Sequence, residues 1–147
     1  MKMEKNKDKS VGTAIGRTLR VFKNTMQKHF EDAGFKLSVE QWLILLLLKM
    51  QDGRTQQELC NAAVKEKTTV TRLIDALEKK QMLLRVKDKN DRRNNLIYIT
   101  DTGRQAEEIL TPIAFTINEK AVKGFKKDEI AHLLDMLNRM VENLSDS

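Results

Sequence analysis

The side chains with the clearest chemical potential in this sequence are hydroxyls and an arginine that could contact a nucleic acid. Thr68, Thr69, Thr71 and Arg72 stand together near the start of a helical pattern. Short hydroxyl side chains let a helix approach a polyanion closely, and an arginine reaches either a guanine edge or a phosphate. These four residues are therefore candidate DNA contacts. The helix alone leaves an alternative open, an amphipathic helix whose polar face simply meets solvent.

A basic tip between two strand-like runs provides a second candidate contact. Residues 83–86 and 96–100 favour strands, and the polar segment between them contains Arg92 and Arg93. Several asparagines in this segment tolerate the positive φ of a hairpin turn. The negative potential of a narrow minor groove attracts arginine, so Arg92 and Arg93 could enter that groove or follow the backbone. Asp91 would pair with a nearby arginine and orient it.

The elements that would position these side chains form a helix-turn-helix. A first short helix is expected from Thr55 to about Ala62, because Thr55 and Glu58 have the spacing of a capping box. A second helix is predicted by an apolar stripe at i, i+3, i+4 and i+7 spacing, made of Val70, Leu73, Ile74 and Leu77. With the hairpin, these helices predict a winged helix-turn-helix over residues of about 37–100.

Long helices are expected on both sides of this module. Apolar positions recur at helical spacing from Ser10 to about Ala33, and Gly34 then ends the helix. A capping box at Ser38 opens a helix that is apolar on nearly every side, which predicts the buried centre. After the wing, a helix capped by Thr100 should continue to about Gly124.

The C-terminal part has one helix breaker and one more apolar stripe. Pro112 should kink the helix that begins after Thr100, because its ring removes one hydrogen bond. A last helix is expected near residues 127–144. A single small lobe cannot cover the stripes at both chain ends, so the helices at about 10–33 and 101–144 predict a homodimer interface. The fold class is thus mainly α with a small β-hairpin wing, with dimerisation helices at both ends.

Composition and charge agree with one soluble DNA-binding domain. The 147 residues suit a single domain over residues 10–147, preceded by a flexible basic tail at 1–9. Residues 54–99 hold 11 Lys+Arg against 6 Asp+Glu, while residues 100–147 hold 6 against 9. The basic excess therefore lies on the proposed DNA-binding module and on the N-terminal arm, where residues 1–40 hold 9 Lys+Arg against 5 Asp+Glu, as attraction to phosphate requires. No apolar run is long enough for a membrane span and no secretory signal is visible, so we expect a cytoplasmic protein without a membrane partner.

The remaining chemical groups give no sign of an active site. We find no catalytic triad, no phosphate-binding glycine loop and no metal-ligand cluster in the sequence, so we expect no enzymatic activity, cofactor or metal. Cys60 is the only cysteine and favours a small buried side chain over a redox sensor. His29 and His132 favour surface or interface roles over a metal site. Trp42 and Met26 could line a ligand cavity, although core packing is the more ordinary role.

The order of these features carries a family resemblance. The segment from Leu59 to Lys80, the wing residues Asp91-Arg92-Arg93, and the following strand with Thr100-Asp101-Thr102-Gly103 resemble the MarR family of bacterial transcriptional regulators. The resemblance implies a homodimer that binds a palindromic operator in double-stranded DNA, usually as a repressor, and often releases it when a small molecule or oxidant binds. It places Thr68, Thr69, Thr71 and Arg72 on the recognition helix and Arg93 on the wing, with Asp91 as its partner.

One residue departs from the family pattern. Gln81 stands where the family commonly has the glycine that ends the recognition helix, and a residue with a Cβ is less favourable in a left-handed conformation. The peroxide-sensing branch has a reactive cysteine near the start of the first helix, which residues 1–33 lack. The sequence thus predicts a DNA-binding repressor, with the operator and the effector left unidentified. A winged-helix module that binds proteins without reading DNA remains the alternative.

Overall fold

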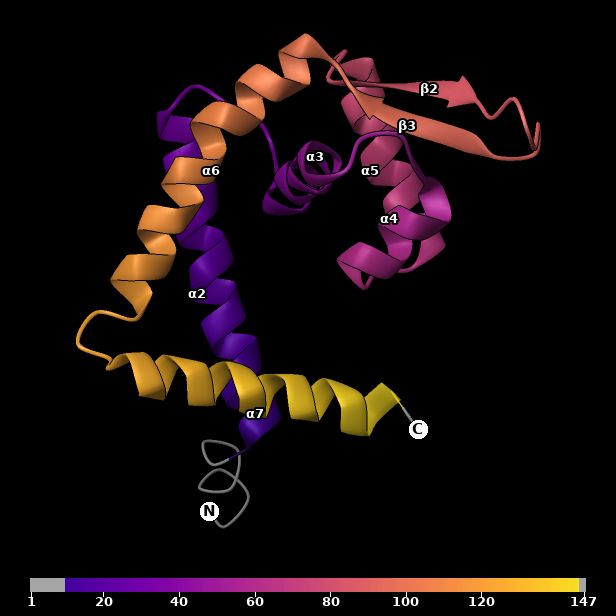
Figure 1. Ribbon diagram of the computed structural model, residues 1–147. Helices are drawn as coiled ribbons and strands as arrows, with labels where there is room; N and C mark the ends of the chain where they lie inside the picture. Colours follow the sequence, from indigo (N-terminus) through magenta and orange to yellow (C-terminus); the bar gives the residue numbers. More distant parts are fainter. Residues whose placement is uncertain (1–9, 146–147) are drawn as a thin grey trace. The chain divides into compact units, whose positions relative to one another are not determined.

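The computed structural model describes residues 10–145, which are mainly helical (Figure 1). Along these residues six helices and a three-stranded antiparallel sheet follow one another. The elements, in chain order, are α2 (Val11–Asp32), α3 (Val39–Met50), β1 (Arg54–Thr55), α4 (Gln56–Ala63), α5 (Lys67–Lys79), β2 (Leu83–Lys87), β3 (Asn95–Ile99), α6 (Asp101–Ala121) and α7 (Lys127–Ser145). The fold class expected from the sequence, a winged helix-turn-helix with helices at both ends, is confirmed. The tail expected at residues 1–9 lies outside the described residues.

The chain divides into two compact units, Met1–Ala114 and Phe115–Ser147. The first unit contains α2 to β3 and the first part of α6, and it holds all of the residues predicted to contact DNA. The second contains the end of α6 and α7.

The core of the first unit is built around α3. A complete capping box opens this helix, because the Gln41 amide N–H donates to the Ser38 hydroxyl and the Ser38 amide N–H donates to the Gln41 side chain, both at 3.0 Å. The side chains of Ile44, Leu45 and Leu48 are fully buried, as expected for the buried centre. Burial of an aliphatic side chain of this size contributes about 1.5–3 kcal/mol, so α3 anchors the unit.

The N-terminal helix α2 packs on α3 through an aromatic pair and an ion pair. The rings of Phe30 and Trp42 meet edge to face, with centroids 5.9 Å apart. Lys23 pairs with Glu40. Partial burial has the largest single effect on the pKa of Glu40 and raises it. The hydrogen bond from Lys23 and the positive charges of Lys23 and Lys65 lower the pKa, and together they bring it below its ordinary value of 4.5. This carboxylate therefore stabilises the fold above about pH 4.5, and the contribution is lost as pH falls through its lowered pKa.

The helix-turn-helix and its sheet follow closely from the pattern. Helix α4 begins after Thr55, whose hydroxyl accepts from the Glu58 amide at 3.1 Å. The reciprocal half of the expected capping box is replaced by a bond from the Thr55 hydroxyl to the Glu58 carboxylate at 3.2 Å. The strand β1 was not predicted. It pairs antiparallel with β3, placing Arg54 opposite Ile97, so the sheet order is β1-β3-β2.

The C-terminal cap of α5 has Gln81 at the position where a glycine was expected. Gln81 adopts the left-handed conformation, with φ of 59°. The amide of Gln81 donates to the Glu78 carbonyl at 2.9 Å, and the amide of Met82 donates to the Leu77 carbonyl at 3.0 Å. These two bonds form a Schellman motif, which normally selects glycine at the position of Gln81. The helix therefore ends at Lys79, and the left-handed Gln81 adds a conformational cost.

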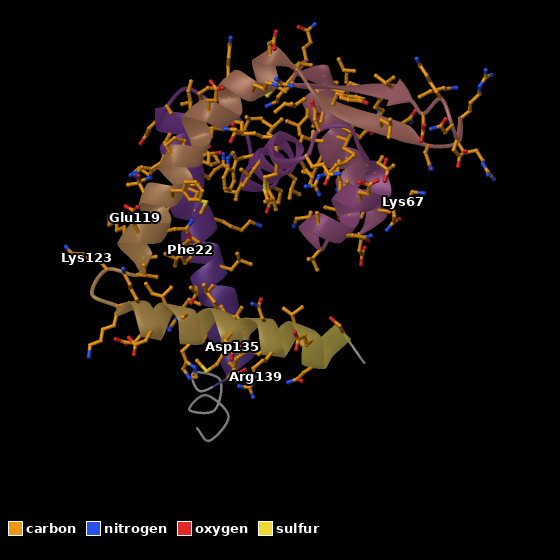
Figure 2. The ribbon with its side chains drawn as sticks, viewed as in Figure 1. Phe22, Lys67, Glu119, Lys123, Asp135 and Arg139 are labelled. Carbon is orange, nitrogen blue, oxygen red and sulfur yellow. The ribbon has the colours of Figure 1, made fainter. Side chains whose placement is uncertain are left out.

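The second unit carries an apolar stripe that its own residues leave uncovered. Helix α7 has no buried residue, and the side chains of Leu134, Val141 and Leu144 are exposed. Asp135 and Arg139 lie one turn apart on the same helix (Figure 2). Helix α6 continues through Pro112 and ends at Ala121, slightly before the expected Gly124. The kink expected at Pro112 stays a prediction.

None of the helices between residues 10 and 145 is both long enough and apolar enough to cross a bilayer.

Candidate nucleic-acid interface

Helix α5 presents one face to the core and the other to solvent. Val70, Ile74 and Leu77 are fully buried, which fixes the rotation of the helix about its own axis. Thr68 and Arg72 then face outward, and Thr69 is half-buried. Of the predicted apolar stripe, Leu73 alone is only partly buried. Thr68 and Arg72 are therefore exposed on the side of α5 that faces away from the core, and DNA contact by them stays a prediction.

The N-terminus of α5 is a second chemical feature that the sequence did not reveal. Glu66 occupies the N-cap, but its side chain makes no capping hydrogen bond. The first amide groups of the helix therefore lack a side-chain acceptor, and such amides are well placed to bind a phosphate. Lys67, the first residue of the helix, is exposed and adds a positive charge there (Figure 2). The signal available in the sequence was a lysine in the first turn, which a helix dipole otherwise disfavours.

Thr71 differs from the other threonines because its hydroxyl has partners inside the protein. The Thr71 Oγ1 donates to the Lys67 carbonyl at 2.8 Å and accepts from the Gln56 side chain on α4. These bonds join the two helices of the helix-turn-helix. A direct DNA contact by Thr71 stays a prediction, and the structure gives this residue a role in holding α5 against α4.

The wing tip has the internal pairing that its sequence predicted. Asp91 Oδ1 accepts from the Arg93 backbone amide at 3.1 Å and from its Nε at 3.3 Å. The same aspartate accepts from the Asn94 amide side chain at 3.5 Å. Arg93 is nonetheless 92% exposed, so its terminal nitrogens point into open solvent. The side chains of this tip extend away from the strands (Figure 2).

Two further predicted contacts have unpaired guanidinium groups. Arg72 on α5 and Arg92 on the wing are both exposed. Neither makes a hydrogen bond or ion pair with any residue between 10 and 145. A long cationic side chain without an internal partner breaks no internal bond when it binds a phosphate or a base edge, although it loses side-chain conformational entropy. Arg72, Arg92 and Arg93 thus lie on the two elements that a winged helix presents to DNA, although DNA contact by each remains a proposal.

An ion-pair network that the sequence analysis missed connects these two elements. Arg85 on β2 pairs with Asp75 on α5 and also donates to Glu78 at 3.1 Å. Its side chain is 25% exposed, which is low for arginine. Asp75 and Glu78 stand one turn apart, so they can share one guanidinium. The sequence shows the charges, but only the packing of β2 on α5 brings them together.

The base of the wing is seated on the end of α5 through the Thr-x-x-Gly segment. The Thr100 hydroxyl donates to the Gln81 carbonyl at 2.6 Å and accepts from the Gly103 amide at 3.1 Å. The Thr100 amide donates to the Met82 carbonyl at 3.1 Å. A Cβ at position 103 would lie 2.1 Å from that same carbonyl oxygen. This close approach explains why the segment requires glycine.

The other candidate residues take ordinary structural places. Cys60 is buried, 6% exposed, in the core of the helix-turn-helix. Nδ1 of His29 lies 2.8 Å from the Thr25 carbonyl of its own helix. Met26 and Trp42 are buried, and the Trp42 indole donates to the Thr111 hydroxyl at 2.9 Å. Core packing is thus the role that the structure gives to Trp42 and Met26, and a ligand cavity lined by them stays a prediction.

Comparison with known proteins agrees with this architecture. The family model described as "MarR family" matches residues 37–94, which cover α3 to the wing tip. The HTH-type transcriptional regulator TtmR of Methylorubrum extorquens (strain PA1) is 30% identical over 112 residues, or 76% of this chain. The chain spans 56% of the length of that relative.

Solved structures of the same kind extend the likeness over nearly the whole chain. The transcriptional regulator SlyA superposes with a TM-score of 0.85 at 26% identity, covering 93% of this chain and 95% of SlyA. The transcriptional repressor CouR, solved bound to a 23-mer DNA duplex, has a TM-score of 0.80 at 24% identity. That match covers 91% of this chain and 94% of CouR. With its helix-turn-helix, basic wing and flanking helices, the chain belongs to the MarR family of winged helix-turn-helix transcriptional regulators.

Proposed function

We propose that this protein is a transcriptional repressor that binds a palindromic operator in double-stranded DNA as a homodimer. The observation that carries the proposal is the set of exposed arginines, Arg72 on α5 with Arg92 and Arg93 on the wing, on two elements held together by Arg85. Arg72 on α5 would reach base edges in the major groove, while Arg92 and Arg93 would contact the adjacent minor groove or its phosphates. The exposed Thr68 and the half-buried Thr69 would add short hydrogen bonds at the helix N-terminus.

The exposed apolar side chains of both chain ends support the homodimer. On α2, Val11, Ile15 and Leu19 are between 40% and 56% exposed although they recur at helical spacing. Helix α7 has the same property and no buried residue at all. Contiguous apolar stripes of this kind are typical of protein interfaces. In a twofold-symmetric dimer, the stripes of the two subunits would be buried against each other.

Repression and its control by a ligand are supported by relatives, and the DNA binding of BpsR of Bordetella bronchiseptica is described as regulated by 6-hydroxynicotinic acid. CouR is described as a repressor and was solved on a DNA duplex. A repressor is released when an effector binds better to a dimer with the wrong half-site spacing. Such a regulator meets the chromosome in the cytoplasm, where we place this protein.

The proposal is tested by selecting random duplex DNA with the purified protein at low and near-physiological salt. We expect a palindromic consensus with half-sites about one helical turn apart. Light scattering of the free protein should give twice the mass of the 17.0 kDa chain. Recovery of unselected sequences, and only at low salt, would instead favour a basic winged-helix module that binds proteins.

Arg93→Ala is expected to weaken operator binding and to lower the slope of log Kobs against log salt by roughly one unit. The physical reason is the loss of one phosphate-like contact by a wing arginine that is 92% exposed. The slope is measured by fluorescence anisotropy at several salt concentrations. Lys28 is an exposed cation on α2, so Lys28→Ala is the matched control and should leave the slope unchanged. An unchanged slope for Arg93→Ala would remove the wing from the interface.

Arg72→Ala should reduce binding to the selected operator by about ten- to hundredfold and reduce binding to random DNA much less. The guanidinium has no internal partner, so its removal leaves the fold intact and takes away a base-reading group. Competition of operator and random duplex for the same protein gives both affinities. Equal losses on the two DNAs would make Arg72 a backbone contact.

A further inference from the structure

A small cavity lies in the first unit where α3, the end of β3 and α6 meet. Its volume is about 240 Å³, below the roughly 300–1,000 Å³ range of sites for drug-sized ligands. Leu48 and Ile99 supply apolar wall, and the remainder of the lining is charged. None of the candidate DNA contacts belongs to this lining. The cavity is therefore separate from the proposed DNA surface and of a size for a fragment-sized ligand.

A buried carboxylate makes this cavity unusual. Glu107 is only 1% exposed, and its Oε1 accepts from the Thr111 hydroxyl at 2.9 Å. No residue between 10 and 145 donates a hydrogen bond to its Oε2. Nζ of Lys49 lies 3.0 Å from that oxygen, in an ion pair that lacks hydrogen-bond geometry. The Oε2 oxygen of this enclosed side chain is thus held by an ion pair alone, and a donor with good hydrogen-bond geometry at Oε2 would be stabilising.

Lys49 is a partner that can be replaced. Its side chain is 52% exposed, so its ammonium group can return to water without a large desolvation cost. Glu107 has no such freedom because it is enclosed. The carboxylate is therefore the permanent part of the site, and the cation is the exchangeable part.

The charge of the lining selects the sign of the ligand. Lys49 forms an ion pair with Glu107, and Arg104 forms an ion pair with Asp52 at 3.2 Å. Glu108 adds a carboxylate without a recorded partner among residues 10–145. The wall thus carries one more negative than positive charge, which favours a cation. An ammonium group can supply three donors to Glu107 and Glu108, and Leu48 and Ile99 would contact a short apolar body.

The floor of the cavity is also the base of the wing. Asp52 Oδ1 accepts from the Ile99 amide at the end of β3, at 2.9 Å, and its Oδ2 accepts from Arg104 at the start of α6. This one carboxylate therefore fixes the strand of the wing to the helix that follows it. A cation in the cavity would compete with Arg104 for Asp52. Occupancy would then change how the wing is held.

We propose that this cavity binds a small primary amine with a short apolar body, through Glu107 in place of Lys49, and that occupancy weakens DNA binding through Asp52. The effect on DNA rests on the proposed function, whereas amine binding does not. Binding is therefore measured first on the free protein, so that the two can fail separately.

The first experiment uses benzylamine, a cation at neutral pH, as the probe in calorimetric titrations and thermal unfolding. We expect saturable binding to the wild type and about tenfold tighter binding to Lys49→Met, because the competing ammonium is gone. In Lys49→Met the buried carboxylate has lost its cation, so benzylamine should restore the melting temperature. Glu107→Gln, which can keep the bond to Thr111, should lose binding.

Controls separate charge from shape. Benzyl alcohol has nearly the same shape without the charge and should not bind, and Glu31→Gln on α2, outside this cavity, should bind benzylamine like the wild type. If Lys49→Met does not fold, Glu108→Gln provides the test, with binding weakened about threefold. No saturable binding to the wild type, equal affinity for Glu107→Gln, or binding of benzoate that depends on Lys49 would each overturn the proposal.

The second experiment measures the effect on DNA. Benzylamine should lower the affinity of the wild type for its selected operator and leave that of Glu107→Gln unchanged. Amine binding without any change in operator affinity would overturn the coupling through Asp52. Absence of DNA binding by the wild type would contradict the proposed function. The result of the calorimetric test of amine binding would not be affected.

Discussion

Gly103→Ala is expected to destabilise the protein by about 3 kcal/mol, at the upper end for inserted methyl groups. The added Cβ would stand 2.1 Å from the Met82 carbonyl oxygen and 2.8 Å from Cγ1 of Ile99. Backbone cannot yield as the end of a long side chain can, so α6 must move away from the end of α5. That movement would also break the bonds of Thr100 to Gln81 and Met82.

The loss is measured by urea denaturation followed by circular dichroism. Gly16→Ala is the matched control, because a Cβ there, inside α2, meets no atom within 4 Å. Alanine is the better helix former, so this control should be neutral or more stable by up to about 1 kcal/mol. Equal stability of Gly103→Ala and the wild type would show that α6 is not seated on Met82.

Arg85→Met is expected to reduce operator affinity by about thirtyfold although Arg85 need not touch DNA. The substitution keeps most of the side-chain volume and removes the guanidinium shared by Asp75 and Glu78. Two carboxylates then remain uncompensated on the recognition helix, where they repel phosphate. The tie between β2 and α5 is lost as well. Anisotropy titrations give the affinity, and urea denaturation verifies that the variant is folded.

A compensating variant distinguishes positioning from direct contact. Asp75→Asn combined with Glu78→Gln removes the stranded charges, so adding it to Arg85→Met should recover part of the lost affinity. A phosphate contact by Arg85 would give no such recovery, and the salt slope would fall by about one unit. The proposed role predicts recovery with a nearly unchanged slope.

Local sequence determined most of the secondary structure of this protein. The capping box at Ser38 and the stripe formed by Val70, Ile74 and Leu77 predicted α3 and α5, because caps and helical periodicity act between residues within one turn of each other. The hairpin followed from two strand-like runs around a basic tip. The pairing of Asp91 with Arg93 also lies within one turn of chain and was predicted for the same reason.

Contacts between distant residues were decided by the tertiary structure alone. Strand β1 has two residues and exists because Arg54 meets Ile97, a pairing that no periodicity in so short a run can predict. Gln81 takes a left-handed conformation because Leu77, Glu78 and Thr100 hold its backbone there, against its own preference.

The candidate site divides in the same way. The sequence by itself determined which residues could contact DNA, because residue type and helical spacing are local properties. Only the packing showed that Arg85 joins the wing to α5, that Thr71 bonds within the helix-turn-helix, and that Glu107 is buried beside a cavity. Each of these depends on side chains from elements that folding brings together, and burial itself is a property of the assembled core rather than of any segment.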